Sequence, residues 1–236
     1  MAVTDCGYLS AGEGGAMIDF PIDDVISWMP ELLDGLALSV KVTLASLAIG
    51  IPFGLLLALG VQAKSKFTRG LCLVIVEIGR GAPALILLQF IYFGLPSAGI
   101  TMTSIVAAIA ALSWNTGAYT SEIIRAGLES VPAGQKEAVM ALNMSRIDGL
   151  RYVILPQGLR VAVPALLGFS ILIFQATSLC FTIAMPELIS RAYEIGSTTF
   201  LYFPALLAAG ILYAMICIPA SMLVSWVEKR AGRFSR

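Results

Sequence analysis

The stretch that decides the fold is Val161–Met185, VAVPALLGFSILIFQATSLCFTIAM, which contains no charged residue. A helix needs about 20 apolar residues to cross the ~30 Å hydrocarbon core of a bilayer, and this stretch is long enough. In lipid the backbone polar groups must be bonded within the segment itself, which favours a helix over a lone strand. The stretch therefore predicts a membrane-spanning helix.

Four further apolar runs lie on either side of this stretch. They cover residues 36–61, 76–95, 103–124 and 200–227, and the second is interrupted by Gly79-Arg80-Gly81-Ala82-Pro83. The whole chain is 58% hydrophobic and only 13% charged, whereas a soluble domain has about 25% charged residues. The sequence thus predicts an all-α membrane protein with five transmembrane helices.

Basic residues gather on one side of the predicted bundle. They lie between the first and second runs, between the third and fourth, and after the fifth: Lys64, Lys66, Arg69, Arg125, Lys136, Arg146, Arg151, Arg160, Lys229, Arg230, Arg233 and Arg236. Arg80 lies at the membrane edge of that side, and only Lys41 and Arg191 fall opposite. Because loops rich in Lys and Arg stay cytoplasmic, we expect the amino terminus outside and the carboxyl terminus inside.

The two ends of the chain differ in charge. Residues 1–34 are acidic and are predicted to form a periplasmic leader, 35–230 the membrane domain, and 231–236 a basic cytoplasmic tail. Apolar residues between Val25 and Leu33 indicate a short amphipathic helix on the outer surface, and a disordered tail is an equal alternative for residues 1–20. No basic segment precedes the first run, so no cleavable signal peptide is expected.

The sequence argues against metal, redox and nucleotide chemistry on this chain. It contains no histidine, and its four cysteines, Cys6, Cys72, Cys180 and Cys217, show no CxxC spacing. It also lacks a G-x-x-x-x-G-K-[ST] motif, the loop that cradles ATP phosphates. No catalytic residue, metal or bound cofactor is therefore predicted.

Residues 125–160 form the longest predicted cytoplasmic segment, and its first half is predicted to form a helix. Pro132 suits a helix start, where its missing N–H has no partner in any case. Ala138 and Ala141 lie on one helical face, and Asn143 can adopt the left-handed conformation that closes a helix. Glu137 is expected to interact with the free N–H groups near the helix start.

The second half of this segment is predicted to form another helix. Ser145 and Asp148 have the spacing of a capping box, and Pro156 is expected to end the helix. A long loop with its own structure is usually functional. The residues alone leave two roles open, docking of another protein or a peripheral helix resting on lipid headgroups.

The same segment resembles the EAA loop of ABC importer permeases. The family pattern is Glu-Ala-Ala, three residues, then Gly, with Ile-x-Leu-Pro after a longer gap. This sequence has Glu137-Ala138-Val139, then Asn143, then Ile154-Leu155-Pro156. Asn replaces Gly at the turn, and Asn is the residue best able to do so where φ is positive.

Further motifs are similar to those of the polar amino acid uptake subfamily and follow the same order. They are Glu77-Ile78-Gly79-Arg80-Gly81-Ala82-Pro83, Phe90–Pro96, Asn115–Ile123, Ser130–Gln135 and Thr177-Ser178-Leu179. The resemblance covers about residues 35–230. It is a resemblance to the permease subunits of type I binding-protein-dependent importers for histidine, glutamine, arginine or opines.

This resemblance implies a transport subunit rather than an enzyme, located in the bacterial inner membrane. The implied partners are a second permease subunit (the same chain or a paralogue), two ATPase subunits that bind ATP and Mg, and a periplasmic binding protein. The loop would dock on the ATPase. The residues implied in this coupling are Pro132, Gly134, Glu137, Ala138, Ala141, Asn143, Asp148, Leu155 and Pro156.

Polar residues inside the predicted spans are candidates for the substrate path, because such residues are costly in lipid. They are Gln89, Asn115, Gln175, Thr177 and Ser178. Each has an alternative role in bonding one helix to another. Relatives often carry Lys-Asp where this chain has Gln175-Ala176, and the missing carboxylate argues against an intramembrane site for a cationic side chain.

Glu77 and Arg80 lie three residues apart, near the inner surface. They are expected to form an inner-end ion pair on one helix face. The alternative is that Arg80 contacts the partner subunit or the cytoplasmic loop.

Two other classes of protein compete with the importer subunit. A carrier or channel without ATPases would need ion-coupling carboxylates or broken helices at the midplane, yet runs three to five contain no mid-membrane acid. A membrane scaffold would need neither the long loop nor the midplane amides. The alternative substrate is an opine or another small polar solute.

Overall fold

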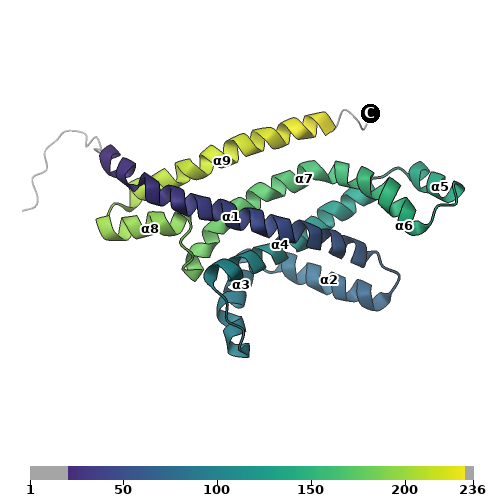
Figure 1. The fold of residues 1–236 in the computed structure, drawn as a ribbon, viewed down its shortest axis with the longest axis horizontal. Coiled ribbons are helices and arrows are strands. Elements are labelled where there is room, and N and C mark those ends of the chain that lie inside the picture. Colours follow the sequence, from purple (N-terminus) through teal and green to yellow (C-terminus); the bar gives the residue numbers. More distant parts are fainter. Residues whose placement is uncertain (1–20, 232–236) are drawn as a thin grey trace, which may run out of the picture.

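The computed structural model describes residues 21–231, which form helices and, within that range, no strand (Figure 1). The α-helices are α1 (Ile22–Val61), α2 (Lys66–Gly81), α3 (Ala84–Gln89), α4 (Ser104–Glu129), α5 (Ala133–Ala141), α6 (Arg146–Asp148), α7 (Leu155–Ala176), α8 (Leu188–Thr199) and α9 (Tyr202–Ala231). Two π-helical segments, η1 (Phe90–Gly94) and η3 (Gly149–Ile154), and two 3-10 segments, η2 (Leu95–Ala98) and η4 (Thr177–Ile183), join them. The all-α prediction is confirmed for this part of the chain.

Three of the described helices are long and apolar enough to cross a membrane: Ile22–Val61, Arg146–Ile183 and Tyr202–Arg230. A fourth crossing results if the bent pair Lys66–Gly81 and Ala84–Ala98 counts as one span. α4 has 26 residues but is not among them, because its many Ser, Thr and Asn side chains lower its hydropathy. Length and composition thus support three or four of the five predicted crossings.

The run at 76–95 is not one continuous helix, which corrects the sequence prediction. Its two halves meet at 107°. Pro83 has no N–H to donate to the carbonyl of Gly79, and a residue before proline is pushed out of the helical region. Ala82 accordingly has φ −83° and ψ 134°, and the helix breaks there.

α1 begins earlier than expected. The predicted short helix between Val25 and Leu33 is the first part of α1 and not a separate element. Leu32 is fully buried in a cluster with apolar residues of α8 and α9, so this part of α1 packs on protein. Residues 1–20 of the predicted leader and 232–236 of the predicted tail lie outside the described residues.

Small residues bring α1 and α4 close together. Ser46, Gly50 and Gly54 recur every fourth residue on the buried face of α1, the spacing that lets membrane helices approach closely. A Cβ on Gly54 would lie 2.9 Å from the carbonyl oxygen of Gly117 and would also overlap Thr120. Little more than a hydrogen atom fits there.

The long axis of the molecule separates two ends (Figure 1). α5 and α6 lie at one end, together with the turn between α1 and α2 and the end of α9. α8 and the start of α1 lie at the other end. The segments rich in Lys and Arg are therefore grouped at the end that carries α5 and α6.

Candidate coupling loop and transmembrane polar sites

α5 ends in the left-handed turn that the sequence predicts at Asn143. Asn143 has φ 54°. Its N–H donates to the carbonyl oxygen of Met140 at 3.0 Å, and the N–H of Met144 donates to that of Val139 at 3.1 Å. These two bonds make up the Schellman motif, which satisfies carbonyls left free at a helix end. The prediction that Asn143 closes the first helix is confirmed.

The second helix of the loop begins at Ser145 but continues past Pro156. The Ser145 hydroxyl accepts from the N–H of Asp148 at 3.1 Å and donates to its carboxylate at 2.6 Å. The helix then runs on through η3 into α7, giving one element from Arg146 to Ile183. The π-helical turn of η3 precedes Pro156 and absorbs the change in bonding that its missing N–H requires. The prediction that Pro156 ends the helix is wrong.

Glu137 is the fifth residue of α5, and the first turn of this helix contains no acidic residue. Its carboxylate therefore lies beyond the free N–H groups, and the expected interaction with the helix start is not supported. Glu137, Ala138 and Ala141 are all exposed. Pro132 directly precedes α5, and Gly134 lies in its first turn.

The tip of the loop presents apolar side chains to the outside. Met140, Leu142 and Ile147 are 69%, 74% and 75% exposed. Sequence reasoning did not single out Met140 or Ile147. Val139 is the residue that packs inward, against Gly149. Exposed apolar residues on a charged loop are typical of a surface that binds a partner.

Asn115 binds α4 to the broken end of α2. Its side-chain N–H donates to the carbonyl oxygen of Gly79 at 3.0 Å, the group that Pro83 leaves without its helical donor. The hydroxyl of Tyr119 likewise donates to the carbonyl oxygen of Arg80 at 3.3 Å. Asn115 is only 7% exposed. Its contacts support the helix-bonding role over the substrate-path role.

Asn115→Leu is expected to destabilise the chain by about 1–3 kcal/mol, because a buried carbonyl would be left unpaired. The measurement is thermal unfolding of the protein in detergent. Trp114→Phe is the matched control. It removes a 3.1 Å bond to the carbonyl oxygen of Ile75, which keeps its own helical donor, so a smaller loss is expected. Equal losses in both variants would contradict this account of the bend.

The other polar candidates lie at the junction of α7 and η4, apart from Gln89. Gln175 is exposed, and its side-chain nitrogen lies 3.7 Å from Cys217 Sγ on α9. Thr177 is fully buried, and Ser178 is partly exposed and donates to the carbonyl oxygen of Gln175 at 2.8 Å. Gln89 ends α3 and makes no side-chain hydrogen bond within residues 21–231. The five candidates thus do not form one cluster.

Arg80 pairs with α4 and not with Glu77, which corrects the predicted inner-end pair. Arg80 Nη1 lies 3.5 Å from Glu122 Oε2, and Arg125 contacts Glu122 and Glu129 at 2.7 Å each. Glu77 is exposed and has no ion pair among the described residues. The ion pair with Glu122 therefore joins the end of α2 to α4.

Glu187 is a buried carboxylate that sequence reasoning missed. It is 0% exposed, and it accepts from the N–H of Ile189 at 2.9 Å, from the N–H of Ser190 at 2.8 Å and from the hydroxyl of Tyr213 at 3.2 Å. Burial raises the pKa of this carboxyl, and the hydrogen bonds from Ile189, Ser190 and Tyr213 oppose the rise. Its contribution to stability is therefore lost as pH rises through the raised pKa. The only sequence signal for Glu187 is an acidic residue directly before a helix, which predicts an ordinary helix cap and not a buried carboxylate.

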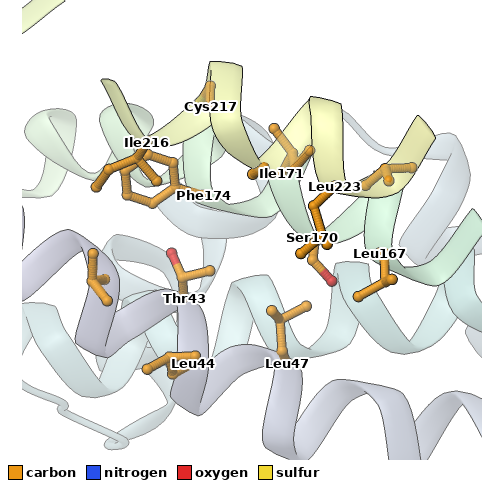
Figure 2. A pocket seen from close by; sticks show the side chains of 13 residues that line it. Thr43, Leu44, Leu47, Leu167, Ser170, Ile171, Phe174, Ile216, Cys217 and Leu223 are labelled. Atoms are coloured by element: carbon orange, nitrogen blue, oxygen red, sulfur yellow. The ribbon is translucent and has the colours of Figure 1, made fainter. Parts of the chain in front are cut away.

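A hollow of about 230 Å³ lies between α1, α7 and α9 (Figure 2). Its lining is apolar apart from Thr43, Ser170 and Cys217. The two hydroxyls already donate to carbonyls of their own helices, at 2.8 Å each. The hollow therefore offers no charged or free polar partner for a zwitterionic amino acid.

Comparisons with known proteins agree with this arrangement. Residues 50–233 match the family described as the binding-protein-dependent transport system inner membrane component. The chain is 32% identical to the glutamate/aspartate import permease protein GltK of Escherichia coli O6:H1, over 92% of this chain and 100% of that protein. It is 31% identical to the arginine transport system permease protein ArtQ of Bacillus subtilis, over 87% and 94% respectively.

One solved structure is similar to this chain over nearly the full length of both. It is the crystal structure of an amino acid ABC transporter with histidines, one chain of which is 32% identical, with a TM-score of 0.84. The match covers 90% of this chain and 99% of that chain. Sequence and fold thus agree over the same residues.

Proposed function

Because the chain belongs to the family of binding-protein-dependent transport system inner membrane components, we propose that it is the permease subunit of an amino acid ABC importer in the inner membrane. The observation that carries this function is the full-length likeness to named amino acid permeases. The chain is a transport subunit, and its family gives it no catalytic role of its own.

The substrate class is a polar amino acid. One relative is named for glutamate and aspartate and another for arginine, so the shared fold serves side chains of either charge. In the permease pattern that the sequence resembles, Lys and Asp are common at the positions of Gln175 and Ala176. This favours a substrate without a cationic side chain, and an opine or another small polar solute is the alternative.

Five helices cross the membrane in this proposal, with the amino terminus outside. α2 with Ala84–Ala98 forms the second crossing and α4 the third. α4 can cross despite its polar residues, because Thr116, Thr120 and Asn115 are buried against α1 and α2 and not exposed to lipid. The grouping of Lys and Arg at the α5–α6 end supports a cytoplasmic location for that end.

The loop at this end docks on an ATPase subunit. The exposed apolar side chains at its tip support this role. A helix that only rested on lipid headgroups would not need to project beyond the ends of the other helices. The proposed complex contains a second permease subunit, two ATPase subunits that hold ATP and Mg, and a periplasmic binding protein. Closure of the ATPase pair would move the two loops and rock the two helix bundles.

Copurification tests this function directly. The chain, expressed with its neighbouring genes, is expected to bring down a P-loop ATPase. Reconstituted membranes should take up an amino acid only when ATP and the binding protein are present. Uptake that continues without any ATPase would identify a carrier instead and would overturn the proposal.

Gln175 is the exposed residue among the five candidates for the substrate path, and we propose that it lines this path. Gln175→Leu is therefore expected to lower amino acid uptake several-fold without loss of complex assembly. Cys217→Ala is the control, since it removes the other partner of the same 3.7 Å contact. Uptake of labelled substrate into proteoliposomes measures both. Normal uptake by Gln175→Leu, or equal loss in both variants, would assign Gln175 to helix packing.

A further inference from the structure

The start of α2 is held by little of its own chain. The buried residues of this helix, Val76 and Gly79, both lie in its second half. Residues 64–71 are all exposed, and Gly70 has no neighbour within 4 Å of its ideal Cβ position. The first turns of α2 therefore offer their surface to a partner outside this chain.

An apolar stripe runs along the exposed side of α2. Phe67, Leu71, Val74 and Ile78 are 81%, 51%, 55% and 46% exposed, and their spacing of four, three and four residues places them on one helical face. The step from position 67 to position 78 is about 16 Å along a helix. One leaflet contributes about half of the ~30 Å hydrocarbon core, so the stripe is as long as one leaflet is deep.

Three basic residues lie where this stripe begins. Lys64, Lys66 and Arg69 are exposed, and none of them forms an ion pair within the part of the chain that the structure describes. Arg80, by contrast, pairs with Glu122 on α4. The sequence has no acidic residue from position 35 to position 76. The positive charge at the start of α2 is therefore not balanced by nearby residues of this chain.

The cations and the stripe adjoin one another on the helix surface. Gly70 lies four residues after Lys66 and three after Phe67, so the three positions are neighbours. Gly70 has no side chain, which leaves open backbone between the first cation of the helix and the first ring of the stripe. A molecule with an anionic head and an apolar tail fits this pattern, because its head can lie on the cations while its tail follows the stripe.

The end of α9 provides a comparison at the same end of the molecule (Figure 1). It also carries two exposed basic residues, Lys229 and Arg230, and an exposed Trp226. Glu228 lies next to them in sequence, and the Arg230 guanidinium lies 5.2 Å from the centre of the Trp226 ring. The positive charge here is thus partly balanced within the chain, so α2 offers the stronger attraction for an anionic headgroup.

We propose that the start of α2 binds an anionic phospholipid of the cytoplasmic leaflet. Its phosphate lies on Lys64, Lys66 and Arg69, and one acyl chain lies along the stripe. The lipid thereby fixes the inner half of the second crossing, which breaks at Ala82 and so is not held in place by a continuous helix. This inference takes from the proposed function only that the α5–α6 end is cytoplasmic.

Native mass spectrometry of the complete importer, purified in detergent and titrated with phosphatidylglycerol, measures this binding. Phosphatidylcholine, which carries no net charge, is expected to bind about tenfold more weakly. Lys66→Gln with Arg69→Gln is expected to weaken phosphatidylglycerol binding about twenty-five-fold, since each cation near an anionic headgroup contributes about fivefold. Leu71→Ser, which makes the stripe polar and keeps the cations, should weaken it several-fold.

Lys229→Gln with Arg230→Gln is the matched control, because it removes the same charge from an exposed helix end on the same side. It should change the affinity for phosphatidylglycerol by less than about threefold. Glycerol 3-phosphate has the headgroup phosphate but no acyl chain, and it should not displace the lipid at equal concentration.

The outcomes separate the lipid site from its alternatives. Equal losses in the two double variants, equal binding of the two lipids, unchanged affinity in Leu71→Ser, or displacement by glycerol 3-phosphate would overturn it. The same holds if Lys66→Gln with Arg69→Gln keeps its affinity for phosphatidylglycerol but no longer copurifies with the ATPase, since the cations would then contact protein. ATP-driven uptake by the wild type tests the importer function separately, so either proposal can fail without the other.

Discussion

Gly54→Leu is expected to prevent α1 from packing on α4 and to remove most of the folded protein. The new side chain would have to enter a space where a single Cβ already lies 2.9 Å from the Gly117 carbonyl oxygen and 3.1 Å from the Ser121 nitrogen. These are backbone atoms of a helix, so they cannot move aside as a flexible side chain could. Overpacking of this kind costs about 3 kcal/mol or more.

The measurement is the yield of monodisperse protein in detergent together with its unfolding temperature. Gly70→Leu is the control, because Gly70 is also helical but has no neighbour within 4 Å of its ideal Cβ position. Leucine has a better helix propensity than glycine by about 1 kcal/mol, so the Gly70→Leu variant should be as stable as the wild type or more stable. If both leucine variants fold equally well, the close approach of α1 and α4 is not what holds the bundle together.

Ala138→Trp is expected to leave the membrane helices folded and to abolish coupling to the ATPase. Ala138 is exposed on α5, so the larger ring meets no part of this chain's core. It would instead stand between the loop and a partner surface that approaches a small residue closely. We expect binding-protein-stimulated ATP turnover to fall at least about tenfold, which corresponds to ~1.4 kcal/mol of lost docking free energy.

Glu137→Lys tests the charge at the same surface, because Glu137 is exposed and does not cap its helix. Ala98→Trp is the control for a bulky aromatic group on an exposed alanine, placed in η2 and outside the loop. ATPase copurification and stimulated turnover are measured for all three. Survival of both properties in Ala138→Trp and in Glu137→Lys would show that this loop is not the coupling element.

Local features of the chain were predictable because they depend on neighbours in sequence. The uncharged stretch at Val161–Met185 required a helix in lipid. The turn at Asn143 followed from the few residues that tolerate positive φ. The interruption at Gly79–Pro83 was visible in the second run, but the sequence did not predict that the helix breaks there with a bend of 107°.

Features that depend on distant partners were not predictable in the same way. Arg80 has Glu77 one turn away, yet it pairs with Glu122 on another helix, a choice that only the packing of α2 on α4 decides. The sequence left Asn115 open between the substrate path and a helix-bonding role, and its hydrogen bond to the Gly79 carbonyl, which lacks a helical donor, favours the second. Glu187 has only the sequence signal of an ordinary helix cap, because its burial depends on how α8 packs against the rest of the molecule.

The contact between Gly54 and Gly117 also bears on how the chain is made. The two residues are separated by about 60 positions, so a ribosome working at about 5–20 residues per second needs some 3–12 s to supply the second after the first. During that interval α1 has no α4 to pack on, and its glycine and serine face meets lipid or the insertion machinery. A pause in translation between these two helices should therefore expose the nascent protein to membrane proteases, and the completed α4 should end that exposure.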